Sequence, residues 1–343
     1  MMVGKVTAWT LSVRWTPRLK RTAQLLTLGA VYLAAAPGAA EIVSIVSTNS
    51  SGPKAANLKA ELFKPVGHGR FPAVVLMHGC GGWQPAVLDA LHTHAQRFLD
   101  KGYVVLNVDS FGPRGNSGGS VCQSDAALVK ALEYRTRDAF DALRYLVSLD
   151  FVDPDNVFLM GQSNGGSVAI NAAKAGGRPG FRAVAAYYPW CGSLGGSAVK
   201  LNAPLIIFSG GRDDWTLARE CRNKTSTGKH LQVVEYPNAP HSFDVGITPQ
   251  RYLGKLVGFD EAAAADSRAK MLAFFGDNVA RKARQNEAGD QERLLAHGAI
   301  GTGHGSEVAR SSRSDSTRNP DADSVLNLQE QDSSNPLSSP VTP

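Results

Sequence analysis

The sequence is poor in cysteine and lacks a hydrophobic run long enough to span a membrane. Only four of the 343 residues are cysteines. The apolar run at roughly residues 25–36 holds about twelve residues, whereas a transmembrane helix needs about 20. The sequence also has no H-E-x-x-H motif and no Cys/His cluster at zinc spacing. We therefore expect neither a metal ion nor another cofactor.

Acidic residues are absent from the first forty positions, which hold five basic residues. A basic stretch ends at Arg21, the short apolar run follows, and small residues at positions 38–40 precede Glu41. This order is typical of a secretory signal peptide. We predict a leader over residues 1–40 and a secreted or periplasmic protein with no stable membrane span after the leader is removed. A buried N-terminal helix is the alternative.

The formal net charge of +6 comes mostly from this leader. Of the 36 Lys and Arg residues, five lie in the first forty positions, which leaves 31 basic against 30 acidic residues in the remainder. A nearly neutral domain lacks the basic footprint that nucleic-acid binding requires. We therefore expect no nucleic-acid partner.

The even number of cysteines permits two disulfide bonds in an exported protein. Cys191 and Cys221 each follow one of two neighbouring predicted strands at the same end, which favours their pairing. Cys80 would then pair with Cys122. Four buried thiols are the alternative.

Residues 41–280 have the pattern of one α/β domain. Apolar runs alternate with helical patterns, as in a mostly parallel sheet that is covered on both faces. Eight strands are predicted at residues 42–47, 58–63, 73–77, 104–108, 157–160, 183–187, 205–209 and 232–236. Five helices are predicted at residues 88–101, 124–149, 164–175, 216–224 and 266–279, and a turn is predicted at 153–155.

The composition changes after about residue 281. Residues 301–343 are rich in Ser, Asp, Asn, Gly and Pro and hold few large apolar side chains. Such a segment cannot bury enough apolar surface to offset the entropy lost on ordering. We predict that residues 281–343 form a low-complexity, disordered tail.

The strongest functional signal is the segment Gly161-Gln-Ser163-Asn-Gly165, which lies between a predicted strand and a predicted helix. A G-x-S-x-G sequence in this context forms a sharp turn that presents the serine beyond the sheet. The neighbours must be small because the nucleophile's backbone is strained and side chains would clash with the turn. Ser163 is the predicted nucleophile. A glycine-rich turn that only packs helix on strand is the alternative.

A serine hydroxyl is a poor nucleophile without a base, and the base must lie at the same edge of the sheet. Of eight histidines, His241 follows the last predicted strand at its carboxyl end. Asp213 follows the preceding strand and would orient the imidazole. Asp214 and Asp109 are the alternatives for this acid.

Acyl transfer also requires hydrogen-bond donors for the developing oxyanion. We expect one to be the backbone N–H of Asn164, directly after the nucleophile. The other is expected from the turn His78-Gly-Cys80-Gly-Gly82, where small residues let the backbone approach the reacting carbonyl. The backbone N–H of Cys80 is the predicted donor, and a simple strand-ending turn is the alternative.

Over roughly residues 57–280 the sequence resembles the dienelactone hydrolase family of α/β-hydrolases. The resemblance rests on five segments, namely 71–82 (FPAVVLMHGCGG), 109–115 (DSFGPRG), 161–166 (GQSNGG), 211–215 (GRDDW) and 241–243 (HSF). It implies an α/β-hydrolase fold with a mostly parallel eight-stranded sheet, helices on both faces and no large cap domain. It also implies Asp213 and His241 as the acid and the base, in the chain order serine, acid, base.

One position departs from the family pattern. The founding members are cytoplasmic and carry cysteine at the nucleophile position, whereas this chain has Ser163 and a predicted leader. The departure indicates a broader esterase or lactonase among exported relatives that use serine. It also makes the nucleophile more dependent on its base, since a hydroxyl resists deprotonation more than a thiol.

We therefore predict a serine hydrolase that cleaves a small-molecule carboxylic ester or lactone through an acyl-enzyme. A serine peptidase or acyltransferase on the same scaffold and a non-catalytic exported binding protein are the alternatives. Arg114 is expected to pair either with a substrate carboxylate or with an internal acid. The predicted substrate-binding residues at this sheet edge are Trp83, Phe111, Arg114, Tyr188, Trp190 and Trp215.

Overall fold

The computed structural model of the chain describes residues 40–48, 57–116 and 119–280. The predicted leader, apart from Ala40, and the predicted tail lie outside the described residues. Within these ranges, no helix has the length and apolar character needed to cross a bilayer.

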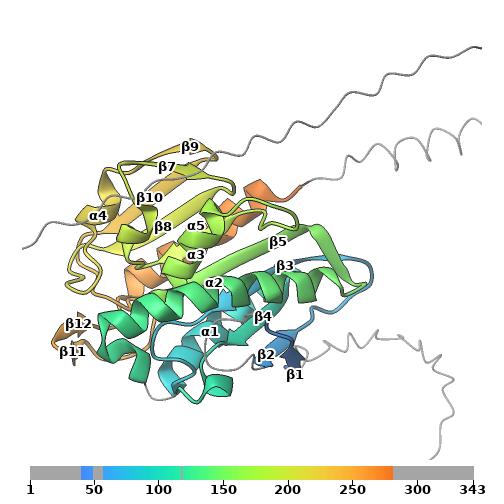
Figure 1. The fold of residues 1–343 in the computed structure, drawn as a ribbon, viewed down its shortest axis with the longest axis horizontal. Helices are drawn as coiled ribbons and strands as arrows, with labels where there is room; N and C mark the ends of the chain where they lie inside the picture. Colours follow the sequence, from blue (N-terminus) through green and yellow to red (C-terminus); the bar gives the residue numbers. More distant parts are fainter. Residues whose placement is uncertain (1–39, 49–56, 117–118, 281–343) are drawn as a thin grey trace, which may run out of the picture. The chain divides into compact units, whose positions relative to one another are not determined.

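An eight-stranded sheet forms the centre of the domain, with the strand order β1-β2-β4-β3-β5-β6-β8-β10 (Figure 1). Strands β4 to β10 in this order run parallel, and β1 and β2 are antiparallel additions at one edge. The mostly parallel, eight-stranded sheet predicted from the sequence is confirmed. In chain order the strands are β1 Glu41–Ile45, β2 Leu58–Phe63, β3 Phe71–Met77, β4 Val104–Asp109, β5 Val152–Gln162, β6 Val184–Tyr187, β8 Leu205–Gly210 and β10 Leu231–Tyr236.

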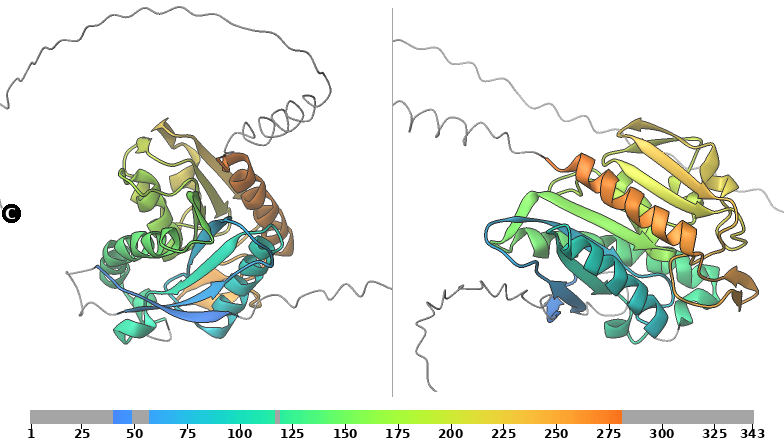
Figure 2. Two further views of the ribbon diagram at one scale, coloured as in Figure 1. Left: turned by 90° about the vertical axis from the view of Figure 1, so that its right-hand side faces the viewer. Right: turned by 180° about the vertical axis from the view of Figure 1, so that it is seen from behind.

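Helices cover both faces of this sheet (Figure 2). One face packs against α2 (Asp125–Val147) and α3 (Asn164–Lys174), and the other against α1 (Pro85–Leu99) and α5 (Glu261–Asn278). Side chains of β3 point alternately to the two faces of the sheet. Val75 packs in the core between the sheet and α2 and α3, and Val74 packs in the core between the sheet and α1 and α5; both are fully buried. A strand that is apolar on both faces therefore lies at the centre of the sheet, as expected.

Two helices begin where a side chain caps the first turn. Ser124 Oγ accepts the N–H of Ala127 at 3.0 Å and starts α2, as the sequence predicts. Asp260 Oδ1 accepts the N–H of Ala263 at 2.9 Å and starts α5, so the helix predicted at 266–279 begins five residues earlier, at Glu261. Each cap satisfies a backbone donor that has no partner within the helix.

Two local predictions need correction. The helix predicted at 216–224 is only the short α4, Arg219–Arg222, because the N–H and hydroxyl of Thr216 are both bound to Asp213. The turn predicted at 153–155 lies inside β5 and forms a bulge, since Val152 pairs with Phe71 while Val157 already pairs with Ala73.

The sequence pattern missed several small elements outside the central sheet. The strands β7 (Ala198–Leu201) and β9 (Thr225–Gly228) pair in parallel, and β11 (Gln250–Tyr252) and β12 (Lys255–Val257) form an antiparallel hairpin. Three short 3₁₀ helices are η1 (Gly112–Arg114), η2 (Ser120–Gln123) and η3 (Cys191–Leu194).

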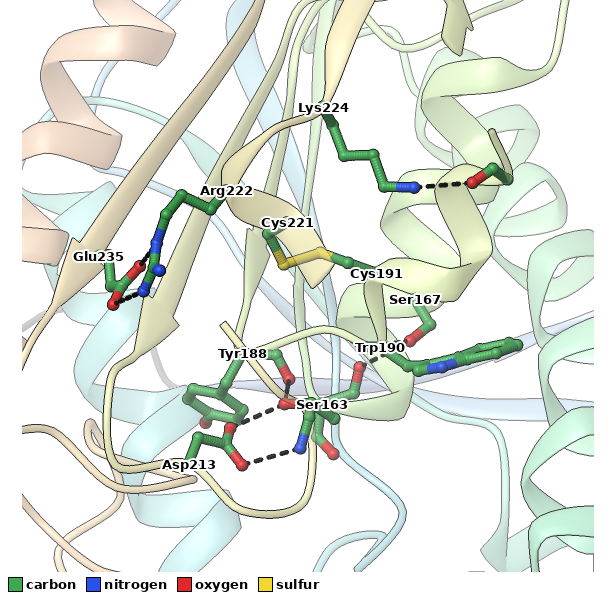
Figure 3. The surroundings of a disulfide bond; sticks show 12 residues. Ser163, Ser167, Tyr188, Trp190, Cys191, Asp213, Cys221, Arg222, Lys224 and Glu235 are labelled. Atoms are coloured by element: carbon green, nitrogen blue, oxygen red, sulfur yellow. Dashed lines mark hydrogen bonds and ion pairs between the residues drawn. A yellow bond between two sulfur atoms is a disulfide. The ribbon is translucent and has the colours of Figure 1, made fainter. Parts of the chain in front are cut away.

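Both predicted disulfide bonds are confirmed. Cys80–Cys122 joins the turn after β3 to η2. Cys191–Cys221 joins η3 to α4, as Figure 3 shows. Each bond therefore ties together two short segments beyond the carboxyl ends of the strands.

Candidate active site

Ser163 occupies the turn between β5 and α3 and has an unusual backbone conformation, with φ of 52° and ψ of −115°. The flanking glycines are required by close backbone contacts. A Cβ atom on Gly161 would lie 2.0 Å from the carbonyl oxygen of Gly165, and one on Gly165 would lie 2.2 Å from that of Met77. The turn is thus strained at the serine and free of side chains at both glycines, as the motif predicts.

The loop after β10 brings a histidine to the serine hydroxyl. His241 Nε2 lies 3.0 Å from Ser163 Oγ, and His241 Nδ1 lies 2.7 Å from Asp213 Oδ2. The backbone of His241 is held by β12, because its N–H donates to Leu256 at 3.2 Å. Three residues from three different loops therefore form one continuous hydrogen-bonded chain.

Of the three candidate acids, Asp213 is the one that contacts the imidazole. Its Oδ1 accepts the backbone N–H groups of Trp215 and Thr216, both at 2.8 Å. Burial alone would raise the pKa of Asp213, but the adjacent His241 and the hydrogen bonds from His241 and Thr216 outweigh it and hold the pKa below its ordinary value. Asp213 is therefore ionised at neutral pH.

The other two candidate acids bind elsewhere. Asp214 accepts the N–H of Leu256 at 2.6 Å and pairs with Arg251 at 2.9 Å, so it holds the β11–β12 hairpin. Asp109 accepts the N–H groups of Phe111 and Gly112 at 2.9 and 2.8 Å and shapes the turn after β4.

The two predicted oxyanion donors lie on either side of the serine. Asn164 is the first residue of α3, where helical N–H groups have no partner within the helix. Cys80 lies in the turn after β3, and a Cβ built on the adjacent Gly79 would be 3.3 Å from Ser163 Cβ. Among the described residues neither N–H has an acceptor. Both donors are therefore free to bind a substrate oxygen.

A buried arginine, missed in the sequence, connects these two donor segments. Arg135 on α2 is fully buried and donates to the carbonyl oxygen of His78 at 2.6 Å and to Asn164 Oδ1 at 2.7 Å. Burial lowers the pKa of Arg135 to about 10, so the side chain remains cationic at neutral pH. The sequence did offer one signal for this arginine, because Arg135 lies on the same face of the predicted helix as the buried residues Ala131 and Ala142.

His78, whose carbonyl oxygen binds Arg135, has a neutral imidazole ring. It is fully buried, and burial followed by the charge of Arg135 lowers its pKa well below the ordinary value. Its Nε2 accepts the N–H of Ser110 at 3.2 Å. His78 therefore joins the turn after β3 to the turn after β4.

A second buried cluster, also missed in the sequence, lies behind the histidine. Asp244 accepts hydrogen bonds from His94 Nε2 at 2.7 Å, from the Tyr188 hydroxyl at 2.5 Å and from Gln162 Nε2 at 2.9 Å. Gln162 precedes the serine, and the Tyr188 ring lies 4.8 Å from the ring of His241. The cluster thus joins the loop that carries His241 to the turn that carries Ser163.

Two cavities meet at Ser163, and three of the predicted substrate-binding residues line them. A cavity of about 210 Å³ includes Tyr188, Trp215 and His241, and one of about 470 Å³ includes Trp190, Trp215 and Asn164. Trp190 is 46% exposed, and its backbone N–H donates to Ser167 Oγ at 3.0 Å (Figure 3).

The other three predicted binding residues line neither cavity. Trp83 packs beside the α1/α5 core, and Phe111 packs against His78 with ring centres 4.7 Å apart. Arg114 forms a two-point ion pair with Asp138, at 2.7 and 2.8 Å, and both side chains are buried. Of the two partners considered for Arg114, the structure therefore contains the internal acid.

The family model that describes the dienelactone hydrolase family matches residues 58–279 of the sequence. This chain belongs to the dienelactone hydrolase family. Membership gives it an α/β-hydrolase fold, in agreement with the sheet and its helical layers.

Two curated proteins are similar to this family member. A "probable 2-oxo-3-(5-oxofuran-2-ylidene)propanoate lactonase" from Bradyrhizobium is 26% identical over 200 residues, which make up 54% of this chain and 78% of that protein. The quorum-quenching protein AidA from Acinetobacter baumannii is 32% identical over 114 residues, or 33% of this chain and 34% of that protein.

Solved structures share the dienelactone hydrolase fold with this chain. A structure named m3DLH has a TM-score of 0.55 and 20% identity, covering 71% of this chain and all of that one. A dienelactone hydrolase-like promiscuous phosphotriesterase from metagenomic libraries has a TM-score of 0.50 and 18% identity, covering 70% of this chain and 99% of that one. Together, the family and its relatives support an ester or lactone hydrolase.

Proposed function

We propose that this member of the dienelactone hydrolase family is a serine hydrolase that cleaves a carboxylic ester or lactone through an acyl-enzyme on Ser163. The observation that carries the proposal is the hydrogen-bonded chain from Ser163 through His241 to Asp213, with distances of 3.0 and 2.7 Å. This chain opens directly onto both cavities.

In the first half-reaction, Ser163 Oγ attacks the carbonyl carbon while His241 Nε2 takes the hydroxyl proton. Asp213 accepts the Nδ1–H of His241 and stabilises the imidazolium. The N–H groups of Asn164 and Cys80 bind the oxygen that becomes negative. The bond to the leaving oxygen then breaks, and His241 gives that oxygen its proton.

In the second half-reaction, a water molecule gives a proton to His241 and attacks the acyl-enzyme carbonyl. The same two N–H groups bind the second oxyanion. The bond between the acyl group and Ser163 Oγ breaks, and the proton returns from His241 to the serine. In a lactone the leaving oxygen belongs to the acyl chain, so ring opening alone releases nothing and the product leaves after hydrolysis.

The two disulfide bonds are consistent with an oxidising compartment. Together with the leader predicted from the sequence, they support a periplasmic or secreted location for this hydrolase. The name of the Bradyrhizobium relative supports lactones as one class of substrate to test.

The proposal is tested by replacing the nucleophile. Ser163→Ala should lower kcat for p-nitrophenyl acetate by about 10⁴-fold or more, because it removes the hydroxyl that His241 Nε2 contacts. The matched control is Ser226→Ala on β9, which should behave as the wild type. Covalent labelling by a fluorophosphonate should occur in the wild type and disappear in Ser163→Ala. A Ser163→Ala variant that keeps wild-type activity would contradict the proposal.

A further inference from the structure

The two cavities that meet at Ser163 differ in which part of the hydrogen-bonded chain they contain. We call the smaller one the His241 cavity; its lining includes His241, Ala86, Val87, Val245, Ile247 and Tyr252. We call the larger one the Trp190 cavity; its lining includes Asn164, Trp190, Leu128, Val129, Leu132 and Lys255. Only the smaller cavity is lined by the imidazole.

The position of the base determines which part of an ester each cavity can take. His241 must give its proton to the leaving oxygen, so that oxygen has to lie within hydrogen-bond reach of Nε2. The alcohol portion then extends from this oxygen into the His241 cavity. The acyl portion, on the other side of the carbonyl carbon, extends toward Asn164 and the Trp190 cavity.

The sizes of the cavities indicate which portion is the larger. The Trp190 cavity has a volume of about 470 Å³, and the His241 cavity one of about 210 Å³. Leu128, Val129 and Leu132 come from the first turns of α2 and give the larger cavity an apolar side. The larger cavity therefore suits an extended apolar acyl chain.

Charge in the two cavities argues against an ionised substrate. Among the described lining residues the His241 cavity has no acidic or basic side chain besides the imidazole. The Trp190 cavity has one of each sign, Asp125 and Lys255, and the Lys255 ammonium donates to the Asp214 carbonyl oxygen at 3.0 Å. Arg114 is committed to Asp138. A carboxylate on the alcohol portion would therefore be buried without a partner, which is costly.

We propose that the Trp190 cavity binds the acyl chain and the His241 cavity binds the alcohol, so that the preferred substrates are uncharged esters whose acyl group is larger and more apolar than their alcohol group. This inference rests on the proposed hydrolase function and adds the substrate class to it.

Two tryptophan variants test the assignment. Val129→Trp fills the Trp190 cavity at a position that is 49% exposed, and Ala86→Trp fills the His241 cavity at the second residue of α1. One ester series varies the acyl chain from acetyl to decanoyl on p-nitrophenol. The other varies the alcohol from methyl to naphthyl on a constant acetyl group.

The wild type should prefer octanoyl over acetyl esters by about tenfold in kcat/KM, as expected for burying further methylene groups. Val129→Trp should lower the ratio of kcat/KM for octanoyl to acetyl esters by about tenfold and leave the ratio for naphthyl to methyl acetate within about twofold. Ala86→Trp should do the reverse, lowering kcat/KM for naphthyl acetate by about tenfold and sparing the contrast between octanoyl and acetyl esters.

The assignment would be overturned if Val129→Trp changed the preference among alcohol groups and Ala86→Trp the preference among acyl groups. It would also be overturned if each variant affected both ester series equally. If Ala86→Trp fails to fold, judged by its thermal melting curve, Ile247→Trp fills the same cavity and replaces it. Failure of the proposed function looks different: the wild type would then hydrolyse no ester of either series in a Ser163-dependent way and would resist the fluorophosphonate. 4-Acetoxybenzoate carries a carboxylate on its alcohol portion and should be hydrolysed more slowly than the uncharged 4-acetoxybenzamide. Equal rates for these two esters would contradict the uncharged substrate class.

Discussion

At the residue scale, Arg135 shows how a charged side chain can organise an active site that it does not enter. Its guanidinium binds the carbonyl of His78 and the side chain of Asn164, so one group holds the turns that carry both predicted oxyanion donors. The Cζ atom of Arg135 lies 4.7 Å from the centre of the Phe111 ring, which is a cation–π contact. A buried cation beside the site also favours negative charge on the substrate oxygen.

Replacing Arg135 should therefore affect stability and turnover together. Arg135→Met leaves the His78 carbonyl and the Asn164 amide oxygen without donors, and we expect a loss of about 3 kcal/mol in the free energy of unfolding. We also expect kcat to fall by about 100-fold, the effect of a weakened oxyanion donor, with KM nearly unchanged. Urea unfolding and steady-state kinetics measure the two effects.

Arg135→Lys separates the two roles because it keeps the charge but cannot bind both loops in the same geometry. It should recover part of kcat relative to Arg135→Met. A Met variant with lower stability but wild-type kcat would show that Arg135 acts on folding alone and has no part in positioning the donors.

At the element scale, the β11–β12 hairpin forms a wall of both cavities and depends on Asp214. Gln250, Tyr252 and Val257 line the His241 cavity, and Lys255 lines the Trp190 cavity. Asp214 holds this hairpin through the N–H of Leu256 and the side chain of Arg251. Two adjacent acids thus have different contacts: Asp213 binds His241, and Asp214 holds the hairpin that lines the cavities.

This division predicts different kinetic effects at adjacent positions. Asp213→Asn should lower kcat by about 10⁴-fold, because the imidazole loses the acceptor that sets its orientation and stabilises its charge. Asp214→Asn should mainly raise KM, by less than about tenfold, because the ion pair that it weakens is partly exposed. Both variants are assayed with one ester over a range of concentrations. Equal losses of kcat in the two variants would contradict the assignment.

At the scale of the whole molecule, buried carboxylates make the stability of the domain depend on pH. Asp213 and Asp244 have pKa values below the ordinary 3.8, although burial alone would raise both. His241 and Thr216 lower the pKa of Asp213 through charge and hydrogen bonds. His94 and Tyr188 do the same for Asp244. A carboxylate with a lowered pKa stabilises the fold above its unfolded-state pKa and loses that effect as the pH falls through the folded-state value. Asp138, whose pKa is raised by burial, acts in the opposite direction.

We expect the free energy of unfolding to fall as the pH drops below about 4. Asp244→Asn should be less stable than the wild type at pH 7 but should lose less stability between pH 5 and pH 3. Urea unfolding across this range measures both slopes, with the surface variant Asp89→Asn as the control. If Asp244→Asn lost as much free energy of unfolding between pH 5 and pH 3 as the wild type, Asp244 would not be a source of the pH dependence.

Most elements of the fold could be predicted because their signals are local. Strands such as β3 are short apolar runs, and the start of α2 follows from one capping serine, Ser124. The errors arose where a distant contact overrides the local pattern. The helix predicted at 216–224 is short because Thr216 binds Asp213, and β5 extends through a predicted turn because it pairs with β3 beyond the bulge.

By itself, the sequence predicted the family, the eight-stranded sheet and the position of the serine turn, because glycine spacing and hydrophobic period are properties of neighbouring residues. The disulfide pairing was favoured by the predicted order of the strands, but the structure decided between two disulfide bonds and four free thiols. Only the tertiary structure decided which acid contacts His241, that Arg114 binds Asp138, and that Arg135 and Asp244 lie behind the site. These are contacts between residues far apart in the chain. A buried charge without a partner is costly in free energy, so each one is paired. The fold determines which partner is within reach.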